Sequence, residues 1–322
     1  MRKRYLGDKK FYAAVMAVAV PIMIQNAITN FVGMLDNIMV GQVGTAQMSG
    51  VAIVNQLLFV FNLCIFGAVS GAGIFTAQFA GSKDHTGVRG TFRFKILICL
   101  LLTVLGVGIF LAAGEPLIRL YLKGEGQDQD AELFLRYGMD YLKVMLFGLL
   151  PFAFANAYSS TLRENGQTVI PMLSGIGAVL VNLVLNYIFI FGNFGVPAMG
   201  VRGAALATVI SRYAELAIVA VWTHTHVEKQ PFIQGAFRSM WIPPHLCKQI
   251  LAKGMPLLIN EALWAGGMAV LNQCYSLRSL DVVAATNISS TICNVFNVSY
   301  LAMGNAVGIL IGQKLGAGES PE

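Results

Sequence analysis

Residues 11–44 read FYAAVMAVAVPIMIQNAITNFVGMLDNIMVGQVG. A bilayer core of about 30 Å is crossed by roughly 20 apolar residues in a helix, so this run predicts a transmembrane helix. Pro21 removes one helical N–H and pushes its ring against the preceding turn, which allows the helix to bend there. Burying the carboxylate of Asp36 in a bilayer costs roughly 2.5–3.5 kcal/mol on insertion scales, so Asp36 is a candidate functional residue.

The composition of the whole chain agrees with this first run. Apolar residues make up 56% of it and charged residues 12%, against about 25% charged in soluble domains. Similar apolar runs recur along the chain, so we predict an all-α polytopic membrane protein. The expected helices are 11–38, 48–80, 91–114, 131–160, 168–192, 200–223, 245–276 and 283–314.

Basic residues favour alternate loops, with Lys and Arg before the first run, between the second and third, and between the sixth and seventh. The positive-inside rule therefore places the N-terminus in the cytoplasm, and we expect a multi-pass protein of the bacterial inner membrane. This bias also accounts for the net charge of +6 without a nucleic-acid partner. Residues 223–248, which hold Pro231, Pro243 and Pro244, are interpreted as a cytoplasmic linker between residues 1–222 and 249–322.

An internal repeat relates the seventh and eighth runs to the first and second. Pro21 and Pro256 are 235 positions apart, and the same offset needs no gap. It pairs Gln78 with Gln313, Gly81 with Gly316, and Val60-Phe61-Asn62 with Val295-Phe296-Asn297. The second unit begins six runs after the first, so the two units have the same orientation, as in parallel repeats about the membrane normal. A second six-helix unit is then expected, and a chain ending at Glu322 is interpreted as a fragment or a truncated product.

Several motifs resemble those of the MATE (multidrug and toxic compound extrusion) family of transporters. They are Asp36-Asn37-Ile38-Met39-Val40-Gly41 with Gly44, Ala77-Gln78 with Gly81, Leu162-Arg163-Glu164-Asn165-Gly166, Pro171-Met172, Phe191-Gly192, and Gly203-Ala204-Ala205-Leu206-Ala207-Thr208. The resemblance implies twelve helices in two six-helix lobes. This chain would hold the N-lobe and the first two helices of a pseudo-symmetric C-lobe, eight of an expected twelve.

The resemblance also implies an activity. Members export organic, often cationic compounds in exchange for H⁺ or Na⁺ by alternating access. We therefore expect a monomer in the lipid bilayer, a small organic cation as substrate, and no cofactor besides the coupling ion.

The same resemblance assigns coupling roles to particular polar residues. Asp36 is the acid of the N-lobe cavity, and Asn182, Asn186 and Thr208 are polar residues of the fifth and sixth helices. Relatives typically carry an Asp at the second of the two fifth-helix positions, and the amide of Asn186 cannot titrate. Two alternatives remain open. Asp36 can be a residue exposed at the outer end of its helix, and the two asparagines can serve to hydrogen-bond neighbouring helices to one another.

Glu261, five residues after Pro256, resembles the seventh-helix acid of relatives whose cation site is in the C-lobe. Its repeat partner Asn26 is uncharged, so the two units are not equivalent. We rank Glu261 slightly ahead of Asp36 as the coupling residue. The candidates for the substrate cavity are Gln25, Asn26, Gln78, Asn260 and Trp264.

Other polar groups are interpreted as structural. Arg212 and Glu215 are three residues apart and can pair on one helical face. The five cysteines form no C-x-x-C pair and the four histidines lie in loops or at helix ends, so no metal site is expected.

Two other classes of function fit the sequence less well. A flippase for lipid-linked oligosaccharides, from the same superfamily, should have a markedly cationic cavity to hold a pyrophosphate, whereas Asp36 and Glu261 favour cationic substrates. An intramembrane aspartyl protease needs two apposed membrane Asp residues, and Asp36 alone qualifies. An enzyme is therefore not expected.

Overall fold

The computed structural model describes residues 9–122, 128–276 and 280–318, which form eight long α-helices, one short 3₁₀ helix and no strand. The helices are α1 (Lys9–Gly41), α2 (Thr45–Gly81), α3 (His85–Leu122), α4 (Asp128–Glu164), α5 (Val169–Phe191), α6 (Val201–Thr225), α7 (Pro244–Ser276) and α8 (Leu280–Gly316), with η2 (Pro231–Ile233) before α7. The all-α prediction is confirmed.

The largest differences from the predicted boundaries are at α3, which begins six residues earlier and ends eight residues later than expected. The apolar run marks only the part that suits a membrane, whereas the helix continues into polar residues. Asp84 stabilises the earlier start, since its carboxylate accepts the backbone N–H groups of Thr86 and Gly87 at 3.0 Å each. This is the bonding of an N-cap residue.

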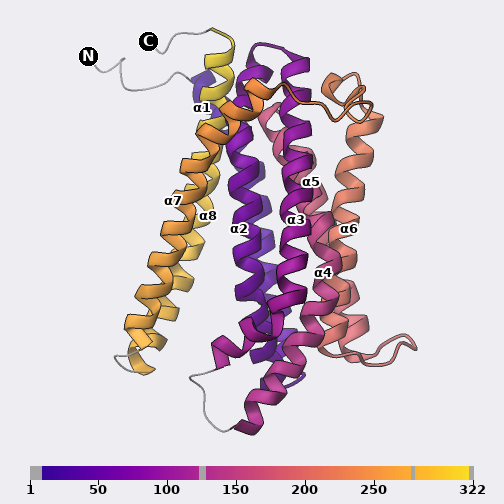
Figure 1. Cartoon of the computed structure of the whole chain (residues 1–322), viewed down its shortest axis with the longest axis vertical. Coiled ribbons are helices and arrows are strands. Elements are labelled where there is room, and N and C mark those ends of the chain that lie inside the picture. Colours follow the sequence, from indigo (N-terminus) through magenta and orange to yellow (C-terminus); the bar gives the residue numbers. More distant parts are fainter. Residues whose placement is uncertain (1–8, 123–127, 277–279, 319–322) are drawn as a thin grey trace.

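Helices α1–α6 form one bundle (Figure 1), and each contains a segment long and apolar enough to cross a membrane. Helices α2, α3, α4 and α6 pack closely, and the main core lies among them. Ile65, Phe92, Leu142 and Ala157 are among its fully buried members. Helix α1 packs mainly on α5 and α8 rather than on its chain neighbour α2.

Helix α1 continues without a break through Pro21, which is buried. A proline within a helix leaves the carbonyl four residues earlier without its helical donor. That carbonyl belongs to Ala17, and the hydroxyl of Thr168 donates to it at 3.3 Å. Thr168 directly precedes α5, so the site of the proline becomes a contact between α1 and α5.

Helices α7 and α8 contact α1 and α2 near the end of the bundle where α1 begins and α8 ends, and diverge from α2 toward the other end (Figure 1). Helices α2 and α8 cross very closely where both of them end. A Cβ atom at Gly81 would lie 1.8 Å from the carbonyl oxygen of Gln313, and one at Gly316 would lie 1.8 Å from that of Gln78. These are the residues that the repeat pairs, so the crossing has local two-fold pseudosymmetry.

The segment between α6 and α7 is anchored to α3 rather than loosely attached. The guanidinium of Arg93 donates to the carbonyls of Ala236 at 2.7 Å, Gly235 at 2.8 Å and Trp241 at 3.2 Å. Phe232 of η2 is fully buried. This segment therefore packs as part of the N-terminal bundle.

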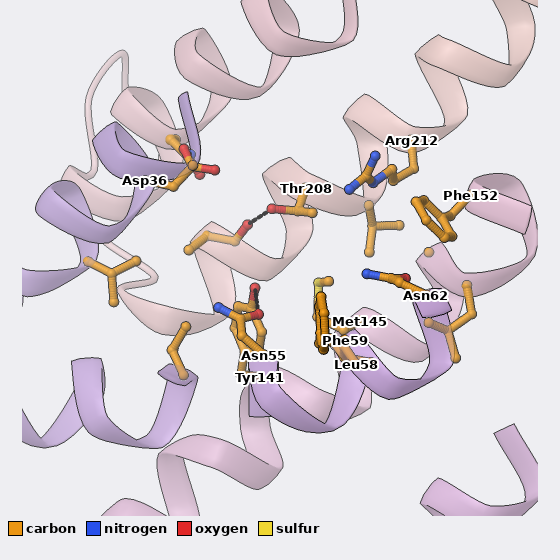
Figure 2. Close-up of a pocket in the computed structure, with 18 residues that line it drawn as sticks. Asp36, Asn55, Leu58, Phe59, Asn62, Tyr141, Met145, Phe152, Thr208 and Arg212 are labelled. Atoms are coloured by element: carbon orange, nitrogen blue, oxygen red, sulfur yellow. Dashed lines mark hydrogen bonds between the residues drawn. The ribbon is translucent and has the colours of Figure 1, made fainter. Parts of the chain in front are cut away.

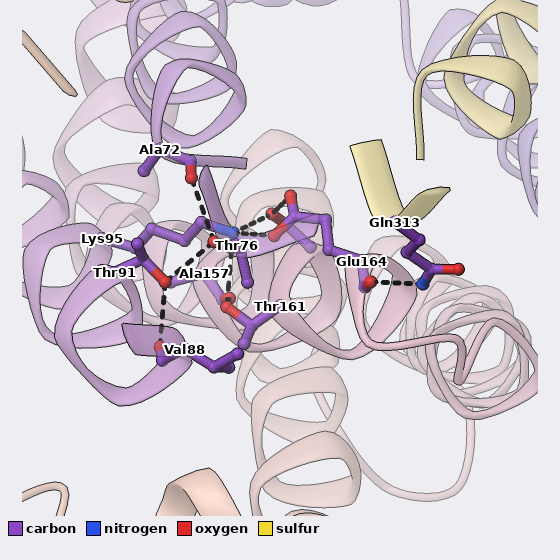
Figure 3. Close-up of polar contacts among 10 residues, drawn as sticks. Ala72, Thr76, Val88, Thr91, Lys95, Ala157, Thr161, Glu164 and Gln313 are labelled. Carbon is purple, nitrogen blue, oxygen red and sulfur yellow. Dashed lines mark hydrogen bonds and ion pairs between the residues drawn. The ribbon is translucent and has the colours of Figure 1, made fainter. Parts of the chain in front are cut away.

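A buried ion pair joins α3 to the end of α4 near the same crossing (Figure 3). The ammonium of Lys95, fully buried, donates to the carboxylate of Glu164 and to the hydroxyl of Ser160 at 2.7 Å. The Ser160 hydroxyl donates to the other oxygen of Glu164 at 2.6 Å. The side-chain amide of Gln313 donates to the Glu164 backbone carbonyl at 2.7 Å, so α8 is bonded to the end of α4.

Candidate functional site

A cavity of about 330 Å³ lies between five helices of the bundle (Figure 2). Its walls come from α1, α2, α4, α5 and α6. The polar and aromatic residues lining it are Asp36, Asn55, Phe59, Asn62, Tyr141, Phe152, Asn186, Thr208 and Arg212. Asp36 lies toward the C-terminal end of α1, far along that helix from its contact with α8.

Three of the predicted coupling residues meet Asp36 at one side of this cavity. The amide nitrogen of Asn186 donates to Asp36 Oδ1 at 2.6 Å and to the amide oxygen of Asn182 at 3.1 Å. The amide nitrogen of Asn182 donates to the hydroxyl of Thr208 at 3.2 Å. The i, i+4 spacing of the two asparagines places both on one face of α5, where they connect α1 to α6.

The orientation of the Asn182 amide decides the hydrogen bonding of this cluster. With its oxygen toward Asp36, that oxygen lies 2.9 and 3.1 Å from the two carboxylate oxygens, all of them acceptors. With the amide turned, its nitrogen donates to both Asp36 oxygens at these distances, and its oxygen accepts from the hydroxyl of Thr208 at 3.2 Å. Asn186 Oδ1 is buried without a partner among the described residues.

The opposite side of the cavity carries a positive charge. Thr208 lies between Asp36 and Arg212 in Figure 2. The expected Arg212–Glu215 pair is present, with 3.4 Å between Nη1 and Oε2, yet Arg212 also lines the cavity. Its guanidinium lies 4.7 Å from the centre of the Phe152 ring. The sequence carried one signal for this placement: Arg212 lies one helical turn after Thr208 and so shares its face.

The five residues proposed for a substrate cavity lie elsewhere. Gln25 packs against Gly175 of α5 and Gln78 lies in the α2–α8 crossing. Asn26 is half-buried on α1, while Asn260 and Trp264 of α7 are exposed. None of the five lines the 330 Å³ cavity, and their assignment to a substrate path stays a prediction.

Glu261 lies within α7, but its side chain is outside the described residues, so its role also stays a prediction. Pro256, the repeat partner of Pro21, is exposed, and α7 continues through it as α1 does through Pro21. The sequence did not identify Asn55, Asn62 and Tyr141 as cavity residues. Asn55 and Asn62 are seven residues apart and share one face of α2, whereas Tyr141 meets them only through the packing of α2 on α4.

No group of three His, Cys, Asp or Glu residues that could hold a metal ion occurs in the part of the chain that the structure describes. The site is instead a mixed polar and aromatic cavity inside a bundle of membrane-length helices. Together with the repeated helix pair, it defines a polytopic membrane protein of the kind in which a helical unit recurs about an axis along the membrane normal.

Comparisons with known proteins identify the family. The family model described as MatE matches residues 21–188, more than half of the chain. The chain therefore belongs to the MATE family. "Probable multidrug resistance protein NorM" from Thermotoga maritima is 29% identical over 310 residues, covering 94% of this chain and 62% of that protein. The chain thus spans less than two thirds of the length of this curated relative.

Solved structures agree on the fold. The crystal structures of MATE in the bent and in the straight conformation each superpose with a TM-score of 0.82 at 23% identity. Each match covers 95% of this chain and 66% of that chain. The predicted MATE-type arrangement of the N-lobe followed by two helices is confirmed.

Proposed function

We propose that the protein is a secondary active antiporter that exports small organic compounds across the bacterial inner membrane in exchange for H⁺ or Na⁺, and not an enzyme. The relatives' description as multidrug resistance proteins supports this class of activity. The observation that carries the proposal is the cluster of Asp36, Asn182, Asn186 and Thr208 at the cavity wall. We propose that the protein acts as a monomer with its N-terminus in the cytoplasm.

The donor set of the cluster suits either coupling ion. Carboxylate, amide and hydroxyl oxygens are hard ligands of the kind that an alkali cation accepts, and the unpartnered oxygen of Asn186 adds to that set. A proton on Asp36 would allow its carboxyl group to donate a hydrogen bond to a facing amide oxygen.

The charge of the cavity bears on the substrate. Asp36 and the aromatic rings of Phe59, Tyr141 and Phe152 are groups that attract an organic cation. A flippase for a lipid-linked pyrophosphate would require a markedly basic cavity. The described lining instead contains one acid and one base, Asp36 and Arg212, so the flippase gains no support. Glu261 remains a proposed second coupling residue on α7.

The test is ethidium efflux from a host that lacks its own drug pumps, with and without Na⁺ in the buffer. Wild type is expected to export ethidium, and Asp36→Asn, which keeps the size of the side chain, is expected to lose that export. The matched control is Asp140→Asn. Asp140 is an acid of α4 that pairs with Arg202 at 2.9 Å and does not line the cavity. Wild-type efflux by Asp36→Asn at equal expression would refute the coupling role.

A further inference from the structure

A largely apolar groove of about 660 Å³ runs along the first turns of α7, at the end of the bundle where α1 begins (Figure 1). The residues of α7 that line it recur every three or four positions and so share one face of the helix. They are Pro244, Cys247, Lys248, Leu251, Ala252 and Met255. Over this stretch a helix rises about 16 Å, roughly half of a bilayer core of about 30 Å. The groove therefore has about the length of one lipid leaflet.

The groove lies beside the face of α7 that packs on the bundle. Leu246 and Ile250 form that packing face, and they are buried in one cluster with Ala72 of α2 and Phe94 of α3. Leu251 and Met255 of the groove are instead 45% and 49% exposed. The groove residues are thus available for contact with the surroundings of the helix, while Leu246 and Ile250 hold α7 in place.

The charge at this groove is positive. Lys248 is the charged residue among its lining, and Arg238 is exposed on the segment that precedes α7. Neither side chain forms an ion pair within the described part of the chain. The sequence has no Asp or Glu between Glu228 and Glu261. An anionic group at Lys248 would therefore meet cationic side chains and no competing carboxylate from this stretch.

The segment before α7 marks the depth of the groove in the membrane. Ile242 lines the groove, and the adjacent Trp241 is 65% exposed. The backbone carbonyl of Trp241 accepts from the guanidinium of Arg93 at 3.2 Å, which fixes this segment to α3. Trp side chains are enriched at the level of the lipid headgroups. An exposed Trp held at the start of the groove places Lys248 near the headgroups and Met255 deeper in the hydrocarbon.

From this arrangement we propose that the groove binds an anionic phospholipid of the cytoplasmic leaflet, with an acyl chain along Leu251, Ala252 and Met255 and the phosphate at Lys248. The apolar stem of a lysine can lie along the groove while its ammonium reaches the headgroups. Basic pockets beside transmembrane helices on the cytoplasmic side suit anionic headgroups. The proposal goes beyond the export activity and rests on the proposed function only for the orientation that makes this leaflet cytoplasmic.

Native mass spectrometry of the purified chain, titrated with single lipids in detergent, tests the proposal. The probes are phosphatidylglycerol, which is anionic, and phosphatidylcholine with the same acyl chains, which is zwitterionic. Wild type is expected to bind the first phosphatidylglycerol molecule about fivefold more tightly, the effect of one basic residue near an anionic headgroup. Inorganic phosphate, which lacks an acyl chain, should not displace the bound phosphatidylglycerol.

Four variants separate the headgroup contact from the acyl-chain contact. Lys248→Gln should weaken phosphatidylglycerol about fivefold and leave phosphatidylcholine unchanged, and Lys248→Arg should keep the preference. Ala252→Phe fills the exposed groove without changing its charge, so it should weaken both lipids. The matched control is Lys229→Gln, which removes an exposed lysine of the same loop that does not line the groove, and it should bind both lipids like wild type.

Four results would overturn the proposal. They are equal affinity of wild type for the two lipids, equal losses in Lys248→Gln and Lys229→Gln, unchanged binding in Ala252→Phe, and displacement of the lipid by inorganic phosphate. The last would make the groove a site for a soluble anion. Failure of the proposed export is a separate result, because it would appear as absent ethidium efflux in cells while the purified chain still prefers phosphatidylglycerol.

Discussion

A single methyl group at Gly81 or Gly316 tests how closely α2 and α8 must cross. The new Cβ would lie 1.8 Å from a backbone carbonyl of the other helix, and Cβ contacts under 3.0 Å essentially never occur. The helices would have to separate by more than 1 Å, because the obstacle is backbone and no side chain can rotate away. Both carbonyls also accept helix-terminal N–H groups, from Ser82 at 3.0 Å and from Ala317 at 2.9 Å.

Overpacking of this kind typically costs 1–3 kcal/mol, so Gly81→Ala and Gly316→Ala should each lower the free energy of unfolding by about that amount. The two glycines lie in one crossing, so the second methyl group should cost less once the first has separated the helices. Unfolding of the chain by SDS in mixed micelles, for both single variants and the double variant, measures these free energies.

The control is Gly308→Ala in the same helix α8, where a Cβ would meet nothing within 4 Å. Alanine has a higher helix propensity than glycine by roughly 1 kcal/mol, so this variant should be neutral or slightly more stable. If Gly81→Ala were as stable as Gly308→Ala, the close crossing would not exist in the protein. Additive effects of the two crossing variants would also contradict the argument, since they would place the glycines in independent contacts.

Three further predictions follow from the bonds around this region. Lys95→Met should destabilise the protein by roughly 3–5 kcal/mol because it leaves the Glu164 carboxylate buried and unpaired, and adding Glu164→Gln should recover most of the loss in SDS unfolding. Arg93→Ala removes three bonds to the segment between α6 and α7, so limited chymotrypsin digestion should cut residues 226–243 several-fold faster than in wild type. Thr168→Val should cost about 1–3 kcal/mol in wild type, where it leaves a carbonyl of α1 unpaired, and less in a Pro21→Ala background, where the new N–H group can bond that carbonyl.

The helices and the repeat were predictable because both can be recognised directly in the order of the residues. Apolar runs mark the helices, and the 235-residue offset relates Pro21 to Pro256 and Gly81 to Gly316. The offset does not reveal that Gly81 and Gly316 meet across the same crossing. That contact depends on how α8 is placed against α2, and no local pattern encodes the placement.

The candidate site was predictable only in part, for a similar reason. Asp36 was predicted because a carboxylate in an apolar run is costly to bury, whereas Asn186 and Thr208 were predicted from the resemblance to the MATE family. Tyr141 lines the cavity as well, but an aromatic residue in a helix gives no such signal. The nearby acid Glu215 accounted for the charge of Arg212, so the position of Arg212 at the cavity wall was not predicted.

Helix α1 connects the cavity to the contact with α8. Toward its C-terminal end Asp36 is bonded to Asn186 of α5, and toward its N-terminal end Ala19 and Ile22 are buried in one cluster with Ala302 of α8. An ion or substrate at Asp36 can therefore alter the contact with α8 only if α1 has two arrangements that differ at both ends. The proline within α1, whose freed carbonyl already bonds outside the helix, is the position at which α1 can bend, so that a single change of the helix alters both ends together. Coupling between the cavity and the α8 contact is then a property of this one helix rather than of the bundle as a whole.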